Sequence, residues 1–176
     1  MRVISGKYKG KKLDGFNIDG TRPTMDRVKE SLFGSIQNYV KDSIVLDLFA
    51  GSGSLGIEAL SNGAKTCYFC DNGSEVLKVL EKNLDNIENT NIIKEDYKEA
   101  LKKLKDKNIK FDLIFLDPPY KLSIITDSIK KILEYDLLNE NGLIICEYET
   151  EDIKCDLELI KTKKYGSKYV KVYKNN

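Results

Sequence analysis

The chain has 176 residues, a formal net charge of +1, four cysteines and no histidine. The length predicts a single domain with a sizeable core, and the lack of histidine excludes Ser-His-Asp and Cys-His catalysis and H-E-x-x-H metal sites. No apolar run approaches the roughly 18 residues of a membrane span, and no apolar signal core begins the chain. We therefore expect a cytoplasmic protein that has no membrane partner and binds no metal.

The first 41 residues carry an excess of positive charge, with nine Lys or Arg against four Asp or Glu. This asymmetry predicts a polyanionic partner for the N-terminal part. Glycines suggest a small hairpin over residues 2–13, and an apolar stripe predicts a helix up to Val40 with Thr24 as its N-cap. Lysines around an aromatic ring suit phosphates and stacked bases, although a solvated surface with ion pairs is the alternative. The candidate RNA-binding residues are Lys7, Tyr8, Lys9, Lys11, Lys12, Arg22 and Arg27.

A strand, a glycine turn and a helix are predicted over residues 44–60, which is the first half of a nucleotide-binding βαβ unit. The turn Gly51-Ser52-Gly53 would let a ligand come close to the backbone. Together with Gly56 it also matches the dinucleotide pattern G-x-G-x-x-G. Asp47 at the strand end would repel a pyrophosphate but attract the ammonium and sulfonium of S-adenosylmethionine. The pattern thus favours S-adenosylmethionine over NAD, and a strand–loop–helix corner without a ligand is the alternative.

Strands and helices alternate along the rest of the chain. The predicted strands are 66–70, 91–94, 111–116 and 143–146, the predicted helices are 74–86, a helix from 98 and 124–138, and a closing hairpin pairs 157–160 with 169–173. With the first strand, these elements predict an α/β fold with a doubly wound, mostly parallel seven-stranded sheet.

Four aspartates are predicted to lie at the carboxyl ends of these strands, where doubly wound sheets bind their ligands. They are Asp47, Asp71, Asp96 and Asp117. Asp71 stands where an acid that binds ribose hydroxyls is expected. Asp96 suits an adenine amino group, or alternatively caps the helix that follows it.

The run Asp117-Pro118-Pro119-Tyr120 follows a strand that is apolar enough to be central in the sheet. Two prolines stiffen the turn and remove two N–H groups, so the Asp117 carboxylate and the Pro118 carbonyl are presented as acceptors beside the Tyr120 ring. Such an array can hold both hydrogens of a nucleobase amine and stack its ring, which turns the nitrogen lone pair toward a sulfonium methyl. We interpret these four residues as a catalytic turn, and a purely structural Pro-Pro turn is the alternative.

The glycine turn followed by Asp117-Pro118-Pro119-Tyr120 resembles the Rossmann-like amino-methyltransferases. Gly6-x-x-x-Gly10-x-x-Leu13 and the run from Arg22 to Phe33 are similar to one branch, the bacterial RsmD family, whose members methylate N2 of a guanine in 16S ribosomal RNA. The resemblance implies a class I methyltransferase fold with S-adenosyl-L-methionine as cofactor. It implies that the cofactor is held by Asp47, Phe49, Ala50, Gly51, Ser52, Gly53, Leu55, Asp71, Asn72, Asp96 and Tyr97.

Residues 1–42 are expected to form a basic hairpin-and-helix extension that contacts RNA, and residues 43–176 the Rossmann-like methyltransferase domain. The expected partner of the monomeric enzyme is 16S rRNA, either free or within an assembling small subunit. A nucleic-acid adenine-N6 methyltransferase could use the same turn, but the chain has no room for a separate target-recognition domain. An NAD-dependent oxidoreductase and a non-enzymatic RNA-binding module are two further hypotheses.

Overall fold

The computed structural model describes residues 1–16, 22–119, 122–148 and 153–176, without the side chains of residues 22–25 and 122. Within these ranges, seven strands form one sheet in the order β3-β2-β1-β4-β5-β7-β6. The strands are β1 Ile44–Asp47, β2 Thr66–Cys70, β3 Thr90–Ile93, β4 Phe111–Leu116, β5 Leu138–Tyr148, β6 Glu158–Tyr165 and β7 Lys168–Lys174. Strands β1 to β5 pair in parallel, and β7 pairs antiparallel with β5 and β6. The predicted seven-stranded doubly wound sheet is confirmed.

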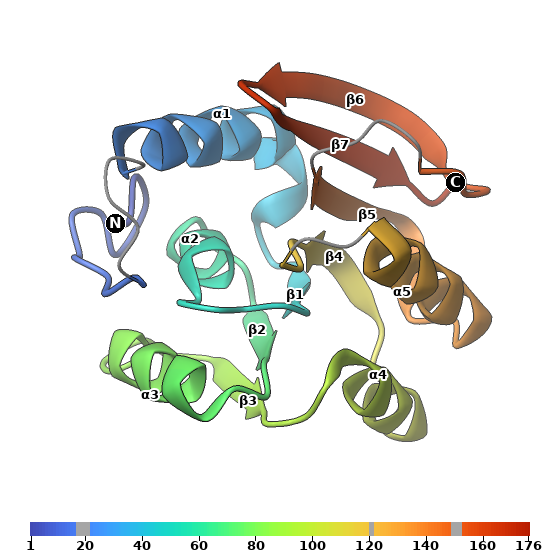
Figure 1. The fold of residues 1–176 in the computed structure, drawn as a ribbon, viewed down its shortest axis with the longest axis horizontal. Helices are drawn as coiled ribbons and strands as arrows, with labels where there is room; N and C mark the ends of the chain where they lie inside the picture. The colour runs from blue at the N-terminus through green and yellow to red at the C-terminus, as the bar shows by residue number, and fades with distance from the viewer. Residues whose placement is uncertain (17–21, 120–121, 149–152) are drawn as a thin grey trace.

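Helices cover both faces of this sheet, with α1, α2 and α3 on one side and α4 and α5 on the other (Figure 1). The helices are α1 Arg22–Val40, α2 Ser54–Ser61, α3 Ser74–Asn83, α4 Tyr97–Asp106 and α5 Leu122–Glu134. Apart from Asp112, strand β4 is apolar because alternate side chains enter the two resulting cores, Phe115 on the α1 side and Leu116 on the α5 side. No helix in the described ranges is long and apolar enough to cross a membrane.

Some predicted boundaries are wrong. Helix α1 begins at Arg22, so Thr24 lies inside it and is not its N-cap. Pro23 fits this earlier start because a first-turn residue has no intrahelical use for its N–H. Helix α5 ends at Glu134 and not at Leu138, since Asp136 adopts a left-handed φ of 54° that stops the helical path. Leu138 instead begins β5 and pairs with Phe111.

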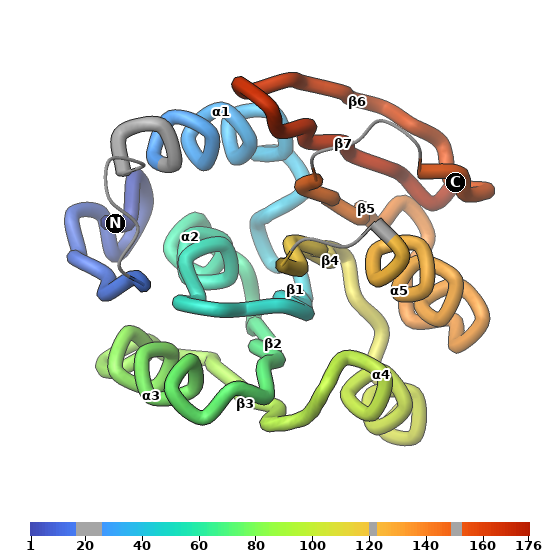
Figure 2. The backbone as a smooth tube through the Cα atoms, viewed as in Figure 1, coloured from blue at the N-terminus to red at the C-terminus, as the bar shows by residue number. Residues whose placement is uncertain are grey.

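The N-terminal segment packs against the rest of the chain as a loop closed by turns (Figure 2). A single bridge joins Arg2 to Lys12 where a hairpin of two strands was predicted. Val3 and Leu13 are buried in the core formed by α1, α2 and the sheet. Residues 1–16 therefore contribute to the hydrophobic core.

A buried ion pair attaches this segment to two helices. Glu58 of α2 is fully buried, and its carboxylate accepts hydrogen bonds from the backbone N–H groups of Ile4 at 2.9 Å and Ser5 at 3.0 Å. Lys29 of α1 lies 3.2 Å from the same carboxylate and donates to the Arg2 carbonyl at 2.7 Å. Burial lowers the pKa of Lys29, while the Glu58 charge acts in the opposite direction. The two buried charges thus pair with each other, and both form hydrogen bonds with backbone groups of the N-terminal segment.

Candidate cofactor and catalytic site

Three carboxylates converge at the carboxyl edge of the sheet. Asp47 ends β1 and is level with Phe69 of β2 and Phe115 of β4. Asp71 and Asp117 each follow those phenylalanines by two residues, so the alternation of side chains directs all three acids to the α1 side of the sheet. The negative charge of Asp71 raises the pKa of Asp47, and that of Asp47 raises the pKa of Asp117. The acids predicted to lie at strand ends do so, and these three share one electrostatic environment.

Asp47 lies behind the glycine turn and is only 2% exposed. Its Oδ2 accepts a hydrogen bond from the Gly56 N–H at 3.1 Å, which ties the end of β1 to the first turn of α2. Burial, aided by Asp71, raises the pKa of Asp47 to about 7, although the Gly56 hydrogen bond acts against this shift. Its charge near neutral pH is therefore sensitive to a cation that binds beside it.

The space beside Gly51 differs from the space beside Gly56. Gly51 and Gly53 adopt left-handed φ angles of 56° and 85°. A Cβ on Gly51 would find its nearest neighbour, Phe16, only at 3.8 Å, whereas one on Gly56 would lie 2.4 Å from the Phe69 ring. Gly51 therefore leaves space for a ligand, and Gly56 lets α2 pack closely on β2.

Alanine substitutions should separate these two roles. Gly56→Ala overfills a packed core and should destabilise the protein by about 1–3 kcal/mol. Gly51→Ala meets no wall but puts a methyl group in the ligand space, so it should abolish cofactor binding at a stability cost of only about 1 kcal/mol for its left-handed backbone. Thermal unfolding and calorimetric titration measure the two effects. Cofactor binding by Gly51→Ala at wild-type affinity would show that the ligand does not approach this turn.

The other predicted cofactor residues lie in the loops after β1, β2 and β3 or at the starts of the helices that follow them. Asp71 accepts hydrogen bonds from the Gly51 N–H at 3.0 Å and the Asn72 N–H at 2.8 Å, so it shapes the loop. Asp96 caps α4 by accepting from the Glu99 N–H at 3.0 Å, so its capping role is confirmed. The rings of Phe49 and Tyr97 lie 5.5 Å apart. Ala50, Ser52 and Gly53 are buried, and Leu55 is half-buried against the core.

The described part of the catalytic turn extends to Pro119, and Tyr120 lies outside the described residues. Pro118 is buried, while Asp117 and Pro119 reach the surface. Protein crowded around the Asp117 carboxyl and the negative charge of Glu147 raise its pKa above the ordinary range, and Lys168 opposes this shift. Although Asp117 reaches the surface, its carboxyl thus lies in a more protected and more negative environment than a solvated aspartate.

Sequence reasoning missed several residues around the site. Glu147 lies beside Asp117, since Leu116 and Cys146 are paired, and it forms a 3.3 Å ion pair with Lys168 of β7. The strand-end rule that found the aspartates would also have found Glu147 if applied to the fifth strand. Asn83 of α3 donates to the Ser52 carbonyl at 2.9 Å and so supports the glycine turn from below. A single polar residue at a helix end offers no such signal in the sequence.

The candidate RNA-binding residues are less uniform than their pattern suggests. Lys7 pairs with Glu88 at 3.5 Å, and the Lys11 Nζ donates to the Asp85 carbonyl at 2.9 Å. Tyr8 is half-buried against the core, which covers part of its ring. Four of the residues are exposed, and the side chain of Arg22 is not described. The exposed ones are Lys7, which is held in the ion pair with Glu88, Lys9, Lys12 and Arg27.

The chemistry of the donor set favours a cationic ligand. No group of three or more metal-binding side chains occurs in the described ranges. Asp47 and Asp71 instead flank the glycine turn through their bonds to the Gly56 and Gly51 N–H groups, and Asp117 is near enough to Asp47 for their charges to interact. A further anion such as a pyrophosphate would be repelled there. The ammonium and sulfonium of S-adenosylmethionine fit this arrangement.

Comparison with known proteins assigns the chain to a family. The family described as "Conserved hypothetical protein 95" matches residues 1–174. The Bacillus subtilis protein YlbH is 40% identical, with 99% of this chain and 98% of that protein covered. A Haemophilus influenzae protein named "Ribosomal RNA small subunit methyltransferase D" is 37% identical, with 99% of this chain and 94% of that protein covered.

A solved structure agrees with the sequence matches. The Escherichia coli protein yhhF superposes with a TM-score of 0.86 at 31% identity, covering 100% of this chain and 98% of that one. The match thus includes the N-terminal segment as well as the sheet. The chain belongs to the Conserved hypothetical protein 95 family, which is the RsmD family that its motifs resemble.

Proposed function

We propose that this protein transfers the methyl group of S-adenosylmethionine to the exocyclic N2 amine of a guanine in 16S rRNA. The observation that carries this proposal is that Asp47, Asp71 and Asp117 lie at one edge of the sheet, beside the glycine turn. Relatives named for methylation of small-subunit ribosomal RNA support the reaction and the class of substrate.

The residues proposed to hold the cofactor are those of the glycine turn, the two acids behind and beside it, and Asp96 and Tyr97 after β3. Bound S-adenosylmethionine supplies an electrophilic methyl group. Asp47 and Gly51–Gly53 would hold its methionine end, Asp71 the ribose, and Asp96 with Tyr97 the adenine edge. The carboxylates attract the positive charges of this ligand, and the open front of Gly51 admits it.

The catalytic turn is proposed to orient the amine of the target base. The Asp117 carboxylate and the Pro118 carbonyl accept its two hydrogens, and Tyr120 stacks on the base. An aromatic amine is a weak nucleophile because its lone pair is delocalised into the ring. Holding both hydrogens directs that lone pair at the methyl group, and the ionised form of Asp117 stabilises the positive nitrogen that forms. The nitrogen loses its proton after transfer, so Asp117 need not act as a base beforehand.

Cofactor affinity should depend on pH through Asp47. Its pKa of about 7 means that its carboxylate gains charge as pH rises from about 6 to about 8, so the affinity for the cationic cofactor should rise over this range. In the free protein the same raised pKa lowers stability as pH rises from about 4 to about 7, since the unfolded chain releases a proton that the folded chain keeps. Asp47→Asn should flatten the pH dependence of cofactor affinity measured by calorimetry. An unchanged slope in this variant would assign the titration to another group.

Residues 1–42 are proposed to guide the RNA to the site, with Lys9, Lys12, Arg22 and Arg27 as the leading phosphate contacts. We propose a monomer that acts in the cytoplasm on rRNA, either free or within an assembling small subunit. The core contacts of Val3 and Leu13 mean that point substitutions test this role better than removal of the segment.

A reconstituted reaction tests the proposal. Purified protein should transfer labelled methyl from S-adenosylmethionine to a 16S rRNA substrate and yield N2-methylguanosine, and it should show no calorimetric binding of NAD. N6-methyladenosine as the product would favour an adenine-N6 methyltransferase. Tight NAD binding without methyl transfer would overturn the proposed function.

A further inference from the structure

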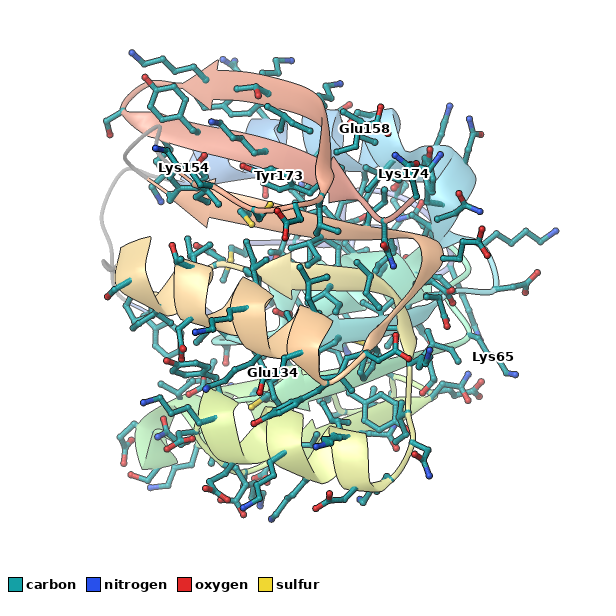
Figure 3. All side chains as sticks on the ribbon, turned by 90° about the vertical axis from the view of Figure 1, so that its right-hand side faces the viewer. Lys65, Glu134, Lys154, Glu158, Tyr173 and Lys174 are labelled. Atoms are coloured by element: carbon teal, nitrogen blue, oxygen red, sulfur yellow. The ribbon has the colours of Figure 1, made fainter. Side chains whose placement is uncertain are left out.

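The C-terminal hairpin carries an excess of positive charge that the sequence interpretation did not use. Strands β6 and β7 span residues 158–174, which contain six lysines and one acid, Glu158. Glu158 is opposite Lys174 in the strand register, at the end of the hairpin that lies away from its turn, where both are labelled in Figure 3. The remaining five lysines therefore lie between that end and the turn at Gly166. They are Lys161, Lys163, Lys164, Lys168 and Lys171.

The lysines of β6 lie on the edge of the sheet, and no acid in the described ranges neutralises them. Strand β6 is the last strand of the sheet, and Lys161, Lys163 and Lys164 are all exposed. Among the described residues, none of these three forms an ion pair with a carboxylate. The Lys163 Nζ donates to the Ser31 hydroxyl at 2.8 Å, which positions the ammonium without cancelling its charge.

Aromatic rings accompany these lysines. Lys163 lies over the ring of Tyr165 at 5.2 Å, and Lys164 over that of Tyr169 at 5.4 Å. Both tyrosines are half-buried, so each keeps part of its ring at the surface. Ammonium groups beside partly exposed rings suit a nucleic-acid backbone together with its bases.

The hairpin leads directly to the catalytic edge. Because β7 runs antiparallel to β5, its first residues lie beside the last residues of β5. The turn between Tyr165 and Lys168 is therefore at the carboxyl edge of the sheet, where Lys168 pairs with Glu147 next to Asp117. Lys161 and Lys163 are on the same face of β6 and about 6.7 Å apart along the strand, a spacing that can follow successive phosphates.

We propose that the β6–β7 hairpin is a second RNA-binding surface, which grips the phosphate backbone beside the target nucleotide through Lys161, Lys163 and Lys164. This inference rests on the proposed function for the identity of the RNA. Lysines on an edge strand can also serve to prevent pairing with other sheets, and that role would require no RNA contact. Measurement of RNA affinity separates the two roles.

The test compares two triple variants of the whole protein by filter binding to a 16S rRNA transcript at several salt concentrations. The first carries Lys161→Gln, Lys163→Gln and Lys164→Gln. The control carries Lys102→Gln, Lys105→Gln and Lys107→Gln, which remove the same charge from exposed positions on and just after α4. Lys105 also lies over a tyrosine ring, that of Tyr135, at 4.9 Å, so the control matches the local chemistry. Helix α4 is at the bottom of the view in Figure 1, far from the β6–β7 hairpin at the top.

The hairpin variant should bind about 10- to 100-fold more weakly at low salt, and the slope of log affinity against log salt should become shallower by about 2. The α4 variant should bind as the wild type does. Lys→Arg substitution at the three hairpin positions keeps the charge and should preserve binding, which also checks that the strand still folds.

Equal binding by the wild type and the hairpin variant would overturn the proposal, as would equal losses in the hairpin and α4 variants. Normal binding to the transcript with weaker binding to purified small subunits would also overturn it and indicate a protein partner. The proposed activity is tested separately. Salt-sensitive RNA binding through the hairpin without any methyl transfer would support this surface and contradict the proposed function.

Discussion

Asp117→Ala is expected to lower the single-turnover rate of methyl transfer to 16S rRNA by about 10²–10³-fold, with saturating cofactor. The reason is the loss of the anionic acceptor that the catalytic turn is proposed to present to the amine of the target base. Cofactor affinity should change little, because Asp47, Asp71 and the glycine turn remain. Asp117→Asn keeps an acceptor oxygen without the charge, so its rate should lie between those of alanine and the wild type.

Asp106→Ala serves as the control for Asp117→Ala. It removes an exposed aspartate at the end of α4, outside the site, and should transfer methyl at the wild-type rate. If Asp117→Ala also reacts at the wild-type rate, the turn after β4 has only a structural role and the proposed catalysis is wrong. A parallel loss of cofactor affinity in Asp117→Ala would assign this residue to cofactor binding.

Lys29→Met is expected to reduce the free energy of unfolding by about 3–5 kcal/mol, since it leaves the Glu58 charge buried without its cation. Chemical denaturation measures the change. The matched control is Lys78→Met, which breaks an ion pair of the same 3.2 Å length between the exposed residues Lys78 and Glu75 and should leave stability close to wild type. The contrast isolates burial as the cause.

A double variant tests whether the unpaired Glu58 charge causes the loss of stability. Replacing Glu58 with glutamine in the Lys29→Met background removes the unpaired charge, so part of the lost stability should return. Equal stability of Lys29→Met and Lys78→Met would contradict the role of the buried pair. It would also show that the N-terminal segment is held mainly by the apolar contacts of Val3 and Leu13.

The sheet and the position of the site could be predicted because their signals are local. Apolar runs ended by glycine or aspartate define the strands, and the alternation of strands with helices sets their parallel order. Strand β4 was predicted with its observed bounds, 111–116, since it is apolar apart from Asp112 and is followed by Asp117 and two prolines. Once strand ends were known, the common edge of Asp47, Asp71 and Asp117 followed from the topology.

The features that sequence reasoning missed depend on tertiary pairing. Lys29 and Glu58 resemble ordinary helix charges, although a lone acid in the apolar helix 54–61 suggests that it needs a buried partner. The six lysines of residues 158–174 give the C-terminal hairpin a positive excess, but its RNA-binding role depends on its position at the carboxyl edge of the sheet, which the sequence pattern does not show. The end of α5 was predicted too late because the left-handed Asp136 has no strong residue signal.

Mass spectrometry of 16S rRNA nucleosides tests the proposed activity most directly. Cells that lack this protein should lose N2-methylguanosine at one position, and expression of the wild-type chain, but not of Asp117→Ala, should restore it. An unchanged N2-methylguanosine content, or loss of N6-methyladenosine in its place, would contradict the proposed reaction.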